Sequence, residues 1–140
     1  MAHPLPPPGG GSRQSDKRPL AALNSLPMTD MFPTPKRIVQ TPALVVVLYE
    51  GDLPRQIHMD GRKLPPDPSP SWQGYSVGRW EGDMLSIESL GFRDDGWLDP
   101  EGHPYSNQLR LTERLRRRDF GHLEYEVSFS DPLYYKEPFS

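Results

Sequence analysis

The chain contains no cysteine among its 140 residues, which excludes disulfide bonds, thiolate metal ligands and cysteine nucleophiles together. No apolar run approaches the ~18 residues of a transmembrane helix. The first eleven residues also lack the apolar core of a secretory signal peptide. The chain is therefore expected to be soluble and cytoplasmic, with no membrane span.

Neither positive nor negative charge is in large excess, because the net charge is only −3 at pH 7. This gives no electrostatic case for a nucleic-acid partner or for an anionic membrane surface. Hydrophobic residues make up only 34% of the chain, whereas the 18 prolines and 12 glycines are many. Since most of these lie outside the periodic segments, we expect residues 1–32 to form a flexible Pro/Gly-rich arm with no chemistry of its own. Residues 33–140 are expected to form one β-barrel domain.

The clearest pattern is an alternation of apolar and polar residues between positions 109 and 130, which Glu113 breaks. Residues at every second position share one face of a strand, so the segment predicts two strands. A turn at 119–121, with Gly121 in the left-handed conformation, sets one register. In that register Arg116 faces Glu124 and Leu115 faces Tyr125. The apolar face and the polar face both fit this one register, and a shift by one residue would destroy the fit on both faces. In this register glutamates neutralise the basic residues.

Further alternating or apolar segments predict the other strands: 37–40, 43–50, 55–60, 74–80 and 83–92. The run 43–49 is apolar on both faces and is expected to be the most buried strand. In the hairpin over the turn at 81–82, Gly78 is expected opposite Leu85 and Ser76 opposite Ile87. With the central hairpin this gives about seven strands joined mostly by tight turns. We therefore expect an all-β fold, either an all-antiparallel meander barrel with a lipocalin-like calyx or a sandwich.

Several short motifs are found between residues 36 and 140: 72–83 (WQGYSVGRWEGD), 91–92 (GF), 97–99 (WLD), 102–104 (GHP), 112–114 (TER), 119–122 (DFGH) and 131–132 (DP). With them the chain resembles a family of small bacterial proteins that are mostly labelled hypothetical. A looser association links this pattern to a small hydrolase of acyl-homoserine lactones from environmental DNA. Members often carry a second histidine and a glutamate after the His-Pro pair, where this chain has Tyr105 and Asn107. The departure weakens any site built on paired histidines.

Three residues are candidates for catalysis. Glu113 falls on the apolar face of the hairpin, where lost hydration disfavours its charged form and suits a general base near neutral pH. It could instead be a structural glutamate, hydrogen-bonded to Tyr, Trp or Arg. Ser76 stands in a G-x-S-x-G pattern, but the helix of a nucleophile elbow does not follow, so it also fits a small inward strand residue. His103 lies in the long loop 93–108, where active-site groups usually occur.

One loop concentrates carboxylates around a glycine, and these are candidate metal ligands: Asp94, Asp95, Asp99 and Glu101. Hard oxygen ligands at such density suit Ca²⁺, although the spacing differs from the helix-loop-helix calcium pattern. A solvated acidic loop is the alternative. Four aromatic residues are candidates for contacting a ligand: Trp72, Trp80, Trp97 and Tyr125. They fit the mouth of a barrel, and the tryptophans fit core or rim positions equally well.

Two functions are compatible with these residues. The first is a small hydrolase that opens a lactone or ester with an acyl tail, as in quorum quenching, with Glu113 as base. Removing the buried charge of Glu113 is then expected to change stability little, or even to raise it. The second is a lipocalin-like carrier that binds a small amphiphilic molecule without altering it. Both need an apolar barrel with a few polar groups, so the composition does not separate them.

Overall fold

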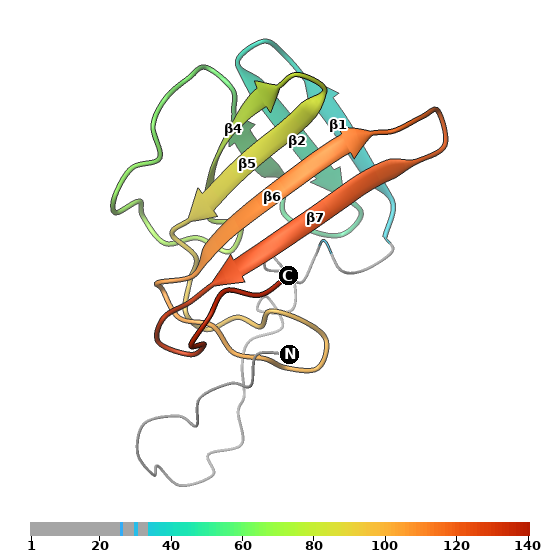
Figure 1. The fold of residues 1–140 in the computed structure, drawn as a ribbon. Coiled ribbons are helices and arrows are strands. Elements are labelled where there is room, and N and C mark those ends of the chain that lie inside the picture. Colours follow the sequence, from blue (N-terminus) through green and yellow to red (C-terminus); the bar gives the residue numbers. More distant parts are fainter. Residues whose placement is uncertain (1–25, 27–29, 31–33) are drawn as a thin grey trace, which may run out of the picture.

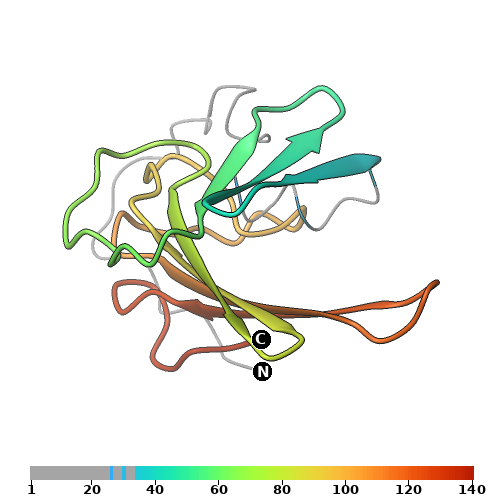
Figure 2. The same cartoon turned by 90° about the horizontal axis from the view of Figure 1, so that it is seen from above.

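One seven-stranded sheet forms the body of the protein. The computed structural model describes Leu26, Asp30 and residues 34–140, so most of the predicted arm lies outside the described residues. The strands are β1 (Lys36–Gln40), β2 (Leu44–Tyr49), β3 (Arg55–His58), β4 (Tyr75–Glu81), β5 (Met84–Leu90), β6 (Arg110–Arg117) and β7 (Leu123–Ser130). They pair in chain order and curl into a half-barrel with β1 and β7 as its edges (Figures 1 and 2). The all-β prediction is confirmed. Among the described residues no helix has the length and apolarity to cross a bilayer.

The hairpin β6–β7 has the register that the alternation predicts. Arg116 lies opposite Glu124, Leu115 opposite Tyr125 and Glu113 opposite a valine of β7. The expected turn conformation is wrong, because Gly121 does not adopt a positive φ. Asp119 closes this turn instead, since its Oδ1 accepts a hydrogen bond of 2.9 Å from the Gly121 amide. A side chain thus takes the place of the left-handed glycine that the sequence predicts.

Two strand pairings differ from the sequence prediction. β3 and β4 run parallel, with Ile57 opposite Ser76, so the sheet is not entirely antiparallel. The proline-rich connector 59–74 is long enough to carry the chain back to the end from which β3 starts. In β4–β5 the register is displaced by two residues, so Ser76 faces Ser89 and Gly78 faces Ile87. A displacement by two keeps every side chain on its expected face.

The apolar side chains form two clusters. One lies where the loops gather at one end of the sheet: Leu26, Phe92, Leu98, Tyr105, Leu109, Leu111, Phe129 and Tyr135. The other lies on the concave face of the half-barrel: Val45, Val47, Tyr49, Ile57, Leu85 and Ile87. The expectation for the run 43–49 is therefore only half right. Its alternate residues are buried, but Leu48 on the opposite face is 40% exposed.

Two glycines with nearly the same φ allow the cost of backbone strain to be distinguished from the cost of a steric clash. Gly74 has φ 64° and Gly82 has φ 66°, both in the left-handed region that favours glycine. A Cβ on Gly74 would lie 2.6 Å from Cε1 of the fully buried Phe92, whereas a Cβ on Gly82 would meet nothing within 4 Å. The two positions thus share the backbone cost of a side chain, and only Gly74 adds a steric clash.

We predict that Gly74→Ala lowers the free energy of unfolding by about 2–4 kcal/mol, the sum of left-handed strain and overpacking. Gly82→Ala should lower it by only about 1–2 kcal/mol, from strain alone. Urea unfolding of both variants measures the difference. Equal losses would show that Phe92 gives way freely and that the core around it is loosely packed.

Candidate active or binding site

A pocket of about 280 Å³ opens on the concave face of the half-barrel. Its apolar wall comes from inward-facing residues of four strands: Val45, Val47, Ile57, Leu85, Ile87 and Leu115. Exposed apolar side chains of the two edge strands stand at its rim, with Ile38 on β1 and Leu123 on β7. The volume is at the small end of the range for small-molecule sites, so it suits a short chain or a single ring.

A buried ion pair lies in this pocket. Arg55 of β3 is 2% exposed and Glu113 of β6 is 1% exposed. The guanidinium grips the carboxylate in a fork: Nη1 donates to Oε1 at 2.8 Å and Nη2 donates to Oε2. Other guanidinium hydrogens reach the hydroxyls of Ser89 at 3.1 Å and Ser76 at 3.4 Å. Such additional hydrogen bonds are what a buried pair needs to offset the loss of water around both charges.

Electrostatics favour the charged form of Arg55. Burial lowers the pKa of Arg55. The charge and hydrogen bonds of Glu113 outweigh this effect and hold the pKa of Arg55 above its ordinary value. The Tyr125 hydroxyl donates a third hydrogen bond to Glu113, 2.9 Å from Oε1. Burial, and then the negative charge of Glu113, raise the pKa of Tyr125, so this hydroxyl stays a neutral donor.

Asp30 brings a second carboxylate to the same guanidinium. Its Oδ2 lies 3.5 Å from Nη1 of Arg55, and its Oδ1 accepts from Lys36 Nζ at 2.8 Å. The Tyr49 hydroxyl donates to Oδ1 at 3.2 Å. Burial and the charge of Asp30 raise the pKa of Tyr49 as well. The pocket thus holds two positive and two negative groups, and its charges balance.

The predicted catalytic residues are only partly brought together. Glu113 lines the pocket, as its place on the apolar face implies. Ser76 is buried beneath Arg55, where its hydroxyl also lies 2.7 Å from that of Ser89. His103 lies in the loop between β5 and β6 and is not part of the pocket wall. Ser76, His103 and Glu113 therefore do not line one common pocket.

Of the four predicted ligand-contacting aromatics, only Tyr125 lines this pocket. The Arg93 guanidinium carbon lies 4.4 Å from the ring centroid of Trp72, which lines a different, larger and more open hollow of about 670 Å³. Trp80 is 52% exposed at the end of β4. Trp97 packs over Gly102 within its own loop. None of the three tryptophans lines this pocket, and the sequence-based alternative was that they are core or rim residues.

Four polar residues of the pocket are absent from the sequence-based prediction: Asp30, Lys36, Tyr49 and Arg55. A signal for Arg55 is present, since it alternates with Ile57 and so faces inward on β3. A buried glutamate needs a partner, and an inward arginine is the obvious one. Asp30 carries no such signal, because it lies in residues 1–32, outside every predicted strand, where no alternation indicates which way its side chain faces.

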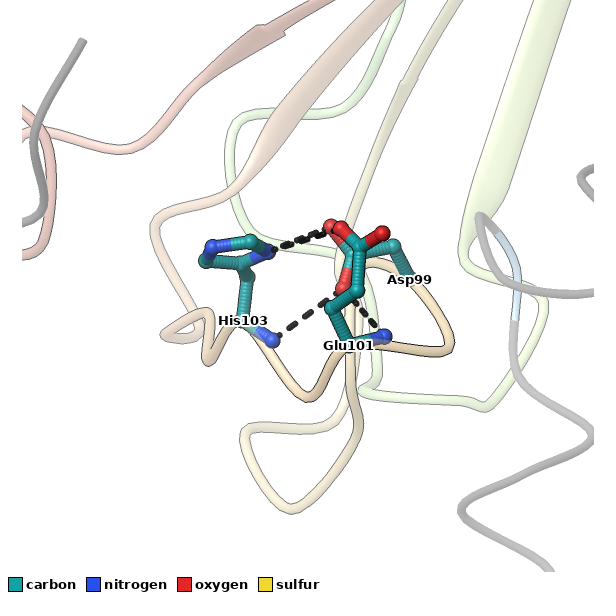
Figure 3. Close-up of side chains that lie close together, drawn as sticks. All are labelled: Asp99, Glu101 and His103. Atoms are coloured by element: carbon teal, nitrogen blue, oxygen red, sulfur yellow. Dashed lines mark hydrogen bonds and ion pairs between the residues drawn. The ribbon is translucent and has the colours of Figure 1, made fainter.

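The predicted calcium set is not assembled either. Asp95 is paired with Arg93 at 3.0 Å, and Asp94 is not part of any cluster of candidate ligands among the described residues. The group that does gather is Asp99, Glu101 and His103, with one ligand atom of each within 4.8 Å of the others (Figure 3). Its tightest contact joins His103 Nδ1 to Asp99 Oδ2 at 2.5 Å. One nitrogen and two carboxylates make a poor calcium site, because Ca²⁺ takes six to eight oxygen ligands.

The chain matches no protein-family model, no curated protein and no solved structure. Its function is therefore inferred from the geometry of the pocket.

We predict that Glu113→Gln lowers the free energy of unfolding by about 3–5 kcal/mol, because the buried Arg55 loses its close counter-charge and keeps only the longer contact of 3.5 Å to Asp30. This replaces the expectation of little change or a rise, which took no account of Arg55. The matched control is Glu124→Gln on the exposed face, which should cost less than about 0.5 kcal/mol. Chemical denaturation gives both values.

The double variant Arg55→Met, Glu113→Leu should recover most of that loss, since apolar residues of similar size can replace a buried pair at little cost. A double variant that is less stable than Glu113→Gln alone would contradict this. The attraction between the two charges would then exceed the cost of removing them from water.

Millimolar calcium should leave the thermal midpoint unchanged, because the loop offers too few oxygen ligands in one place. A ligand that binds only the native state must raise the midpoint, so thermal unfolding with calcium and with a chelator measures binding directly. A clear rise with calcium would restore the site that the sequence predicts.

Proposed function

We propose that the chain binds a small amphiphilic molecule in the concave pocket and leaves it chemically unchanged. The observation that carries this proposal is the pairing of an apolar wall with a few fixed polar groups in one small pocket. Apolar surface supplies affinity for a tail, and the hydroxyls of Tyr49 and Tyr125 with the charges around them can orient a head group. These polar groups already hold one another in place, so little ordering remains to be done when a ligand binds.

Ester or lactone hydrolysis, which the resemblance implies, has less support from the same geometry. Both oxygens of Glu113 are engaged by Arg55, and one also accepts from Tyr125. If Glu113 took a proton from water, the guanidinium charge would remain buried without its partner, which is costly. The other two predicted catalytic residues, Ser76 and His103, do not line the pocket. A carrier needs none of these groups to react.

N-butanoyl-homoserine lactone is a short-chain amphiphile of this class and separates the two functions. Titrated into the ¹⁵N-labelled chain, it should shift the amide signals of pocket strands β2, β3 and β6. Over the same time, ring opening followed by mass should be no faster than in buffer alone, because the lactone also opens spontaneously.

A pair of matched variants ties binding to the pocket. Leu115→Trp places a large ring in the wall and should weaken binding by about tenfold or more, as expected when the apolar burial of a tail is lost. Leu133→Trp, at an exposed position away from the pocket, should leave binding unchanged. Ring opening above the buffer rate that Glu113→Gln abolishes would favour the hydrolase. Absence of any shift with the intact chain would contradict both functions.

A further inference from the structure

The carboxylate of Asp30 sits in the pocket as a bound ligand would. Asp30 belongs to none of the seven strands, and its oxygens contact three donors of the pocket wall: Arg55, Lys36 and Tyr49. These donors come from three different strands, β1, β2 and β3. A carboxylate held by a guanidinium, an ammonium and a hydroxyl is a common arrangement for recognising an anionic head group.

The contacts of Asp30 are weaker than those of Glu113, although both face Arg55. Glu113 takes the fork of the guanidinium, whereas the closest approach of Asp30 is 3.5 Å, at the outer limit of a hydrogen bond. The side chain of Lys36 is 29% exposed, so another carboxylate can reach its ammonium group from solvent. Glu113 is thus a fixed part of the pocket, and the Asp30 carboxylate can be exchanged for another without dismantling the buried pair.

We infer that the pocket takes an amphiphile with a carboxylate head, which replaces Asp30 on Arg55, Lys36 and Tyr49 while its tail lies along the apolar wall. This inference rests on the proposed binding function. Exchange of one carboxylate for another keeps the charges in the pocket balanced. A neutral head group cannot form the charge-assisted hydrogen bonds that Arg55 and Lys36 offer, so it gains less from the same position.

Asp30 then sets the affinity of the site. A group attached to the chain competes at an effective concentration in the millimolar range, so it holds the donors against a dilute ligand. Removing its charge frees the donors for the ligand carboxylate alone. Binding of a neutral ligand does not depend on these donors and is left as it was.

The test compares octanoate with 1-octanol, which share a tail and differ in the charge of the head. Both are titrated by NMR into the intact chain and into Asp30→Asn. The variant should bind octanoate about tenfold tighter, as expected when a tethered competitor is removed. Its affinity for 1-octanol should stay within about twofold of the original. Asp83→Asn, which removes the same charge at an exposed turn beside Arg116, is the matched control and should change neither affinity.

Lys36→Gln gives a second, independent reading, because it removes a positive charge at the exposed edge strand and leaves the Arg55–Glu113 pair in place. This substitution should weaken the binding of octanoate and leave the binding of 1-octanol unchanged. If the intact chain binds neither ligand, the proposed function fails. If it binds both and neither Asp30→Asn nor Lys36→Gln separates them, the function stands and the carboxylate specificity is wrong. Weaker octanoate binding in Asp30→Asn also overturns the inference.

Discussion

The buried pair of Arg55 and Glu113 is the constraint on which the rest of the half-barrel depends. Each charge is costly to remove from water, and each is tolerable only because the other lies within hydrogen-bond distance. Arg55 belongs to β3 and Glu113 to β6, so the pair joins two strands that have β4 and β5 between them in the sheet. For these two side chains to meet, the sheet has to curl. The hydroxyls of Ser76 on β4 and Ser89 on β5 complete the arginine's hydrogen bonds, so each strand between the two partners contributes.

The pocket follows from the same curvature. Figure 2 shows the curl of the sheet. A flat sheet would leave the apolar residues of β2 and of β6 on one open surface, whereas in the curled sheet both line one pocket with the ion pair. The pair also decides what the site can do. It holds Glu113 in a structural role, which argues against proton abstraction, and it leaves Arg55 with one weaker position that Asp30 now occupies. Binding of an anionic head group and a short tail is the function that these constraints favour.

What the sequence could predict depended on how local the determining contacts are. The β6–β7 register was predictable because two faces of adjacent strands agree, as in the pairing of Arg116 with Glu124. The parallel pairing of β3 with β4 was not, because nothing within either strand records the direction in which the connector returns. Burial of Glu113 was predictable from alternation alone. Its partner was missed because Arg55 is 58 residues away in sequence. The calcium site was predicted from carboxylate density, but two of the four carboxylates are engaged locally instead, Asp95 by Arg93 and Asp99 by His103.

A crystal structure of the chain with octanoate tests the central claim most directly, because it shows which carboxylate Arg55 holds. The account predicts the octanoate head between Arg55, Lys36 and Tyr49, its tail against the apolar wall, and the Asp30 side chain turned out of the pocket. The fork between Arg55 and Glu113 should be unchanged. Octanoate bound elsewhere, or bound in the pocket with Asp30 still on Arg55, would contradict the account.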